Sequence, residues 1–181
     1  MVQAKKHNYR DPIITKLIAL FEELGPEELK GKYYYGSLYA LPQNQNVLPA
    51  VFISQGRDQG SAEGTGRDQS RKTYRIEVSV ELKKEWGRSA KAVETHMDLQ
   101  RYLCGMDEET FDWLPDSFMS ILRAHETLDG EKKLYIDLGS ITDATILPGV
   151  EARGVGIFTY EGMIQFQVRH NQLRPVKPSQ A

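Results

Sequence analysis

The chain has 181 residues and a mass of 20.6 kDa, which suits one domain with a core of ordinary size. Hydrophobic residues make up 40% and charged residues 27%, which excludes a wholly disordered chain, and the net charge of −2 excludes a generic nucleic-acid-binding protein. No apolar run approaches the roughly 18 residues that a membrane-spanning helix needs.

Residues 1–10 are interpreted as a mobile basic arm that carries Lys5, Lys6 and Arg10. They lack the apolar stretch of a signal peptide. The single cysteine of the chain, Cys104, excludes an internal disulfide. A cytosolic protein is the default expectation.

A first helix is predicted over residues 11–24. Asp11 supplies a capping carboxylate, Pro12 suits the first helical position, and Gly25-Pro26 ends the helix. Its apolar residues recur at helical spacing on one face only: Ile13 or Ile14, Leu17, Ile18, Phe21 and Leu24. This helix should therefore lie on a sheet.

Two strands are predicted next, over residues 32–41 and 48–54. The first contains four tyrosines and is interrupted at Gly36, and the second is a short apolar run. Because residues 42–46 read as a turn, we expect the two strands to form a hairpin.

Residues 55–72 contain almost nothing that could be buried and are predicted to be a long mobile loop. The loop repeats Gly-Arg-Asp-Gln, which gives the candidate residues Arg57, Asp58, Arg67 and Asp68. One interpretation is a solvated loop with coincidental repetition. The other is a segment that orders against a neighbouring subunit, with the two arginines as donors to carboxylates.

The segment from Thr73 to Lys84 alternates between apolar and polar residues. This pattern predicts an antiparallel strand with one face on a core and one face in water. A second helix is predicted from Ser89 to Cys104, with Gly105 closing it, and one face marked by Val93, Met97, Gln100 and Leu103.

Residues 106–120 are interpreted as an irregular insert. Asp107 is predicted to cap a short helix that runs through Phe111. The acidic cluster of the insert could hold a cation or perform acid–base work, but solvated capping at a helix start is the preferred interpretation; its members are Asp107, Glu108, Glu109 and Asp112.

Two further strands, 120–126 and 133–138, are predicted to form a hairpin around Asp129-Gly130. Residues 155–169 form either one long strand with a glycine kink at Gly162 or a hairpin that turns at Glu161-Gly162, and the single strand is preferred. Residues 171–181 are predicted to be an extended tail.

The predicted fold class is α+β: a mainly antiparallel sheet flanked by two main helices, with a long mobile loop between two strands. The single domain spans residues 11–170, between the basic arm and the extended tail. Two helices can cover only one face of the sheet fully. The other face, or an edge strand, must therefore carry charged residues or be covered by a partner chain.

The sequence offers little for catalysis. Cys104 could be a nucleophile only beside a histidine, and His96 on the same predicted helix lies about 12 Å away along the axis. His125 and His170 fall in predicted strands. The preferred interpretation of Cys104 is a small core residue. The histidines show no metal-binding spacing and the glycines form no phosphate loop, so we expect no enzyme activity, no metal and no cofactor.

The order of predicted elements resembles the tail terminator proteins of long-tailed bacteriophages. The resemblance is carried by the leading amphipathic helix, the strand Leu48-Pro49-Ala50-Val51-Phe52, the long loop, the alternating strand and the second helix. It covers residues 11–105 and 150–170, where the aromatic-rich last strand closes the sheet. The insert at 106–120 and the tail have no counterpart in this resemblance.

The resemblance implies a hexameric ring that caps the finished tail tube, stops further polymerisation and offers a surface for head–tail joining. Its partners would be copies of itself, the tube protein and a head-side connector, with DNA only passing through the lumen and no membrane. It implies a virion protein assembled in the host cytoplasm, in which the 55–72 loop faces the lumen or a neighbouring subunit. The arms that would reach toward adjoining rings carry Lys5, Lys6, Arg10, Arg174 and Lys177.

Three alternatives stay open. The nearest is a head-side neck protein, such as a head completion or connector-stopper protein. A small cytosolic enzyme that uses Cys104 with a histidine is the second. The third is a peptide-binding module that uses an open strand edge.

Overall fold

The computed structural model describes residues 12–36, 48–55, 63–64, 69–83, 89–130, 134–152 and 157–173. These residues form an α+β fold with three α-helices and one mixed sheet. The helices are α1 (Pro12–Leu24), α2 (Ser89–Cys104) and α3 (Phe118–Ala124), with short 3-10 turns η1 (Glu27–Leu29) and η3 (Leu138–Ser140). The strands are β1 (Tyr33–Tyr35), β2 (Ala50–Gln55), β3 (Glu63–Gly64), β4 (Gln69–Lys83), β5 (Leu134–Asp137), β6 (Thr145–Ala152) and β7 (Ile157–Leu173).

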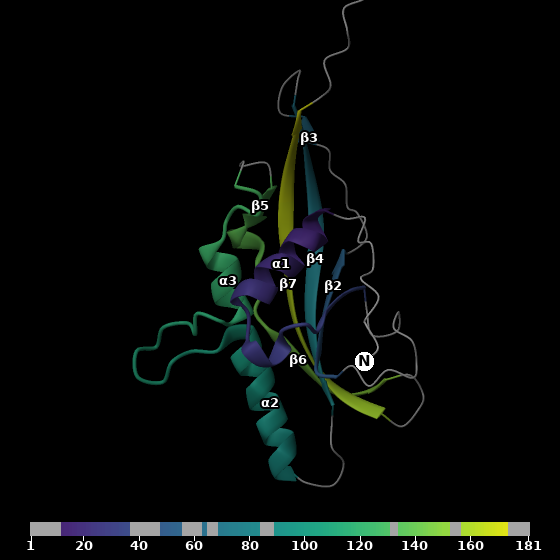
Figure 1. Cartoon of the computed structure of the whole chain (residues 1–181), viewed down its shortest axis with the longest axis vertical. Coiled ribbons are helices and arrows are strands. Elements are labelled where there is room, and N and C mark those ends of the chain that lie inside the picture. The colour runs from purple at the N-terminus through teal and green to yellow at the C-terminus, as the bar shows by residue number, and fades with distance from the viewer. Residues whose placement is uncertain are drawn as a thin grey trace, which may run out of the picture.

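The sheet is built around the antiparallel pair β4 and β7, which run side by side along the long axis of the molecule (Figure 1). Every residue of β4 pairs with β7, from Gln69 with Leu173 to Lys83 with Thr159. The strand order is β1-β2-β4-β7-β5, β3 adds to β4, and β6 pairs with the same edge of β7 as β5. Residues 157–173 are thus one strand that passes through Gly162, so the single-strand prediction is confirmed.

All three helices contribute to one core on one face of the sheet. The buried residues of α1 follow the predicted helical spacing, with Ile14, Leu17 and Phe21 fully buried. The alternating apolar side of β4 meets them, together with the matching side of β7. This core contains Ile76, Val78, Val80, Leu82, Leu99, Leu103, Phe118, Ile121, Leu122, Ile164, Phe166 and Val168.

The predicted hairpin between the tyrosine strand and the Leu48 strand is wrong, because β1 and β2 are parallel. β1 contains only three residues and ends at Gly36, which takes a positive φ of 99°. The segment between Gly36 and Leu48 is long enough for the crossover that a parallel pair needs, on the order of a dozen residues. This arrangement places the Tyr33 ring against Phe21 and Phe118, at centroid distances of 6.2 and 6.3 Å.

The predicted loop at 55–72 is too long at its C-terminal end. Residues 69–72 belong to β4, and within the predicted loop β3 pairs with β4, with Glu63 opposite Arg71. The continuous partner strand β7 explains the extension, since its residues 170–173 offer ladder positions to these polar residues. Alternation alone could not predict this, because residues 69–72 are all polar.

The predicted strand at 120–126 is wrong as well, because residues 118–124 form α3. Ser117 begins the helix, and its Oγ accepts a hydrogen bond from Ser120 N at 3.4 Å. Four apolar residues of α3 are buried against α1 and the sheet: Phe118, Met119, Ile121 and Leu122. A short apolar run suits either a helix or a strand, and here the cap and the core decided for the helix.

The turn at Asp129-Gly130 exists without the predicted strand pair. Gly130 has a positive φ of 65°. A single antiparallel bridge, between Thr127 and Tyr135, joins this segment to β5, and Leu128 N donates to Leu134 O at 3.0 Å. The strand β6 was not predicted. Its pairing with β7 shifts register between Leu147 and Val150, where Pro148 and Gly149 interrupt the strand pattern.

Helix α2 has its predicted bounds, but its buried face differs from the prediction. Leu99 and Leu103 are fully buried, whereas Met97 is 60% exposed and Gln100 is exposed. Among the described residues, no helix is both long and apolar enough to cross a membrane.

Candidate interaction surfaces

The second face of the sheet is the side turned away from the three helices. Its apolar part lies on β1 and β2, where the rings of Tyr34 and Phe52 stack at 5.7 Å and Ala50 and Leu48 pack beside them. The wet face was predicted for residues 73–84, and that prediction is wrong at Ser79 and Glu81 of β4, which are buried. Phe52 and Ala50 are buried because this side of β2 belongs to a second, smaller cluster.

Two carboxylates stand opposite each other in the centre of this second face. Glu81 of β4 and Glu161 of β7 are direct partners in the antiparallel register. Glu81 is buried, and burial raises the pKa of Glu161, with a further increase from Glu77 and a partial offset from a Ser79 hydrogen bond. The register therefore places two acidic side chains side by side on this face, where Ser79 supplies a hydrogen bond to Glu161.

A ladder of polar side chains continues from this pair along β4 and β7. Gln165 Nε2 donates to Glu77 Oε2 at 2.8 Å, and Arg75 donates to the Gln165 side-chain oxygen. The central strands thus carry charged and amide groups on the face that the helices leave uncovered.

A second surface is the 106–113 loop, which projects from the helical side of the molecule between α2 and α3 (Figure 1). It is a small hairpin: Met106 and Trp113 form an antiparallel bridge, and Asp107 N donates to Asp112 O at 2.8 Å. The predicted short helix is absent here, because the Asp107 carboxylate closes a turn instead. Its Oδ1 accepts from Glu109 N at 3.0 Å, Thr110 N at 2.8 Å and Thr110 Oγ1 at 3.1 Å.

These hydrogen bonds lower the pKa of Asp107, so its carboxylate stays charged at neutral pH. Asp107 therefore satisfies backbone amides, as expected for capping, although the capped element is a turn. In the described part of the chain, no group of three or more His, Cys, Asp or Glu residues could hold a metal ion.

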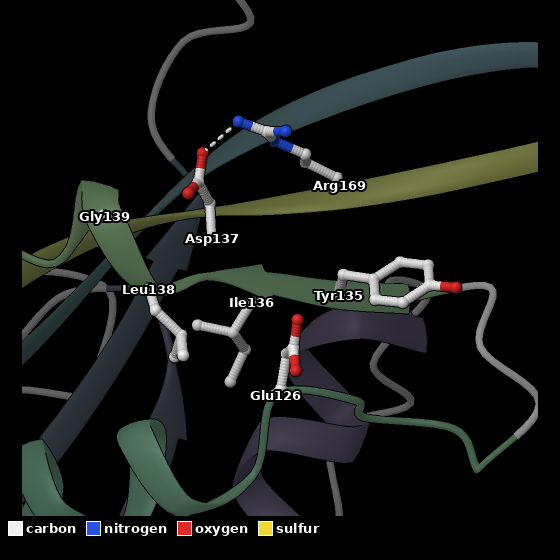
Figure 2. Close-up of a pocket in the computed structure, with 7 residues that line it drawn as sticks. All are labelled: Glu126, Tyr135, Ile136, Asp137, Leu138, Gly139 and Arg169. Atoms are coloured by element: carbon white, nitrogen blue, oxygen red, sulfur yellow. Dashed lines mark hydrogen bonds and ion pairs between the residues drawn. The ribbon is translucent and has the colours of Figure 1, made fainter.

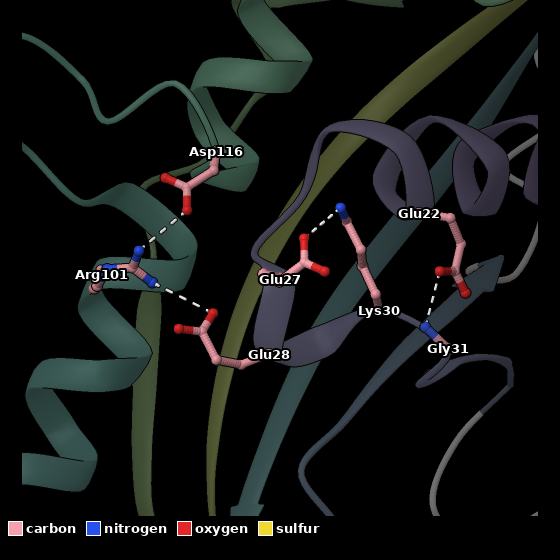
Figure 3. A network of polar contacts seen from close by, with 7 residues as sticks. All are labelled: Glu22, Glu27, Glu28, Lys30, Gly31, Arg101 and Asp116. Atoms are coloured by element: carbon pink, nitrogen blue, oxygen red, sulfur yellow. Dashed lines mark hydrogen bonds and ion pairs between the residues drawn. The ribbon is translucent and has the colours of Figure 1, made fainter.

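The base of the loop is fastened to the helices by Arg101 and Arg123. Figure 3 shows Arg101 of α2 between Asp116, at 3.1 Å, and Glu28 of η1, at 3.9 Å. The Arg123 guanidinium lies 5.3 Å from the centroid of the Trp113 ring. The loop is therefore a fixed projection of the helical layer.

The loop exposes large apolar side chains both at its tip and at its base. Phe111 is 74% exposed and has a positive φ of 60°, which is uncommon for a bulky residue. Met106 and Trp113 are also exposed large hydrophobic residues. Sequence reasoning missed these three as contact residues; the available signal was their placement among acidic residues without helical spacing.

A pocket of about 420 Å³ opens beside β5 and η3. Figure 2 shows Leu138, Ile136 and Glu126 on one side of β5, while Asp137 points to Arg169 on the other, where the two form an ion pair. Tyr135 and Gly139 complete the lining. Two of its three charged groups, Asp137 and Arg169, engage each other.

The Cys104 thiol is poorly suited to nucleophilic attack. It lies half-buried at the end of α2, and burial, with a contribution from Asp143, raises its pKa. A raised pKa keeps the thiol protonated at neutral pH, and the thiolate is the reactive form. The candidate histidines lie elsewhere in the fold: His96 is exposed on α2, the His125 ring contacts Ile121 O at 3.0 Å, and the His170 ring lies near Tyr74.

The candidate loop residues Arg57, Asp58, Arg67 and Asp68 lie outside the described residues, and so do Lys5, Lys6, Arg10, Arg174 and Lys177. Their assignment stays a prediction. Comparison of the chain with known protein families and with curated proteins finds no match.

Proposed function

We propose that this chain is a structural subunit that assembles with copies of itself into a ring, most specifically a tail terminator ring of a long-tailed bacteriophage. The observation that carries the proposal is the one-sided sheet, whose second face combines the Tyr34–Phe52 stack with the opposed carboxylates Glu81 and Glu161. The charged and amide side chains of β4 and β7 on this face can be complemented by polar groups of a neighbouring subunit.

The order of elements supports the same proposal. An amphipathic helix, two strands, a long connection, a long alternating strand and a second helix occur in this sequence, and β7 completes the sheet beside β4. The family likeness implies that such a ring has six subunits, caps the tail tube and provides the surface for head joining. Cyclic symmetry then converts two different surfaces of one subunit into a closed, repeated interface.

The deciding experiment is electron microscopy of tails produced with this chain deleted from an otherwise complete assembly gene set. Overlong tubes without heads are the expected result, because nothing would stop tube polymerisation. Particles identical to the undeleted control would contradict any role in assembly.

The same micrographs separate the nearest alternative. Tubes of normal length that fail to join heads would assign the chain to the head-side neck. The enzyme alternative is tested by Cys104→Ala, for which we expect full complementation because the buried thiol has no role in the ring.

A further inference from the structure

The 106–113 loop holds an aromatic side chain in water on an ordered but strained backbone. Residues other than glycine rarely adopt the left-handed region, yet Phe111 does so at the loop tip with a φ of 60°. The turn that imposes this conformation is closed by Asp107, and Phe111 N donates to Asp107 O at 3.0 Å. Fixed, exposed aromatic residues of this kind are typical anchors of protein interfaces.

The charge around this anchor defines the chemistry of its partner. Residues 106–120 contain no lysine or arginine, and their acidic residues are Asp107, Glu108, Glu109, Asp112 and Asp116. The two arginines at the base already contact Asp116 and Trp113. The partner surface must therefore be basic and must also offer an apolar or aromatic contact to Phe111.

Residues 1–10 of this chain have that chemistry. They contain Lys5, Lys6 and Arg10 without any acidic residue, and they include Tyr9 and Val2 as aromatic and apolar groups. We propose that the 106–113 loop is the docking site for residues 1–10 of a second copy of this chain. The lysines would face Glu108 and Glu109, and the Tyr9 ring would pack on Phe111. This inference rests on the proposed function in that it requires neighbouring copies.

The test is a charge exchange in the full-length protein, with self-association measured by sedimentation equilibrium. The wild-type chain should associate, and added salt should weaken the association because the contact is charged. An arm variant, K5E/K6E/R10E, and a loop variant, E108K/E109K/D112K, should each raise the dissociation constant by at least about tenfold, as expected when several attractive pairs become repulsive. A chain with both sets of changes should recover association.

Mixing the arm variant with the loop variant identifies the second copy. Each variant then finds a complementary surface only on the other, so a one-to-one mixture should form mixed oligomers with alternating subunits. If the arm of each subunit docked on its own loop, mixing would change nothing, and the proposal would be overturned.

The aromatic contact has its own variant pair. Phe111→Asn removes the ring but tolerates the positive φ, so the loop should keep its shape while the dissociation constant rises about tenfold. Met97→Ser is the matched control, since Met97 is 60% exposed on α2 outside the loop, and it should leave association unchanged.

A wild-type chain that stays monomeric at all accessible concentrations would overturn the proposal, as would loop variants that associate normally. Binding of neutral phosphatidylcholine vesicles through Phe111, without self-association, would also overturn it. None of these outcomes decides the ring function itself, because the tail-length phenotype of the deletion tests that function independently.

Discussion

Gly162 of β7 lies directly beneath Leu103 of α2. A Cβ atom at Gly162 would stand 2.5 Å from Leu103 Cδ1, which is closer than packed atoms allow, and 3.2 Å from Leu99 Cδ2, which is tighter than most packed contacts. The glycine therefore permits a close approach of α2 to β7, and this role requires no unusual backbone angle.

Gly162→Ala should lower the free energy of unfolding by about 1–3 kcal/mol, because overpacking displaces α2 from β7. Urea denaturation measures this directly. Gly139→Ala is the control, since a Cβ there would have its nearest neighbour, Asp137 Oδ1, at 3.7 Å. Equal effects of the two substitutions would contradict the close contact between α2 and β7.

Glu161→Gln should stabilise the isolated subunit at neutral pH by about 0.5 kcal/mol, because a neutral amide avoids both the burial of a charge and the repulsion from Glu77. The pKa of Glu161 is raised in the folded protein, so the folded state binds this proton more tightly than the unfolded chain. Tighter proton binding by folded Glu161 stabilises the protein fully at pH values below the ordinary glutamate pKa. This stabilisation is lost as the pH rises through the raised pKa of Glu161 in the folded protein. The variant should therefore lose less stability than the wild type between mildly acidic and neutral pH.

Denaturant titrations at several pH values measure this difference. Glu109→Gln, which removes one exposed negative charge from the loop, is the control and should change neither the stability nor its pH dependence. If Glu161→Gln destabilised the subunit at neutral pH, the Ser79 hydrogen bond to the carboxylate would outweigh its burial and the repulsion from Glu77.

Asp107→Ala should open the 106–113 loop while the rest of the fold stays intact. It removes the acceptor of the Thr110 and Glu109 amides, so these amides should exchange with deuterium faster by hydrogen-exchange mass spectrometry. The folded-state pKa of Asp107 is lowered, so its hydrogen bonds are complete above the ordinary aspartate pKa and are lost as the pH falls through the lowered value. Asp107→Asn keeps one acceptor oxygen and should show a smaller increase in exchange.

Thr142→Val should destabilise the outer edge of β7. Between β5 and β6, the Thr142 hydroxyl accepts from Gln165 N at 3.0 Å, and Ser140 Oγ accepts from Gln167 N at 2.7 Å. These two hydroxyls therefore satisfy backbone amides of β7 where its pairing passes from β5 to β6. Loss of one such hydrogen bond should cost about 1 kcal/mol, whereas Thr142→Ser, which keeps the hydroxyl, should cost much less. Faster amide exchange at Gln165 in the valine variant alone would confirm this role.

The sequence by itself determined the elements whose signal is local and periodic. Helix α1 ends before Gly25-Pro26, as predicted, and the alternating face of β4 faces the core at Ile76, Val78 and Val80. The α+β class and the coverage of one sheet face by helices follow from the same patterns.

Only the tertiary structure decided which strands pair and which side chains far apart in the sequence come together. The parallel alignment of β1 with β2 depends on where Tyr33 can pack, and the helix at residues 118–124 depends on the Ser117 cap and the core beneath it. The juxtaposition of Glu81 with Glu161 and the strained tip at Phe111 arise from register and turn closure. Such features join residues far apart in the chain or depend on backbone angles, and a periodic pattern carries no information about either.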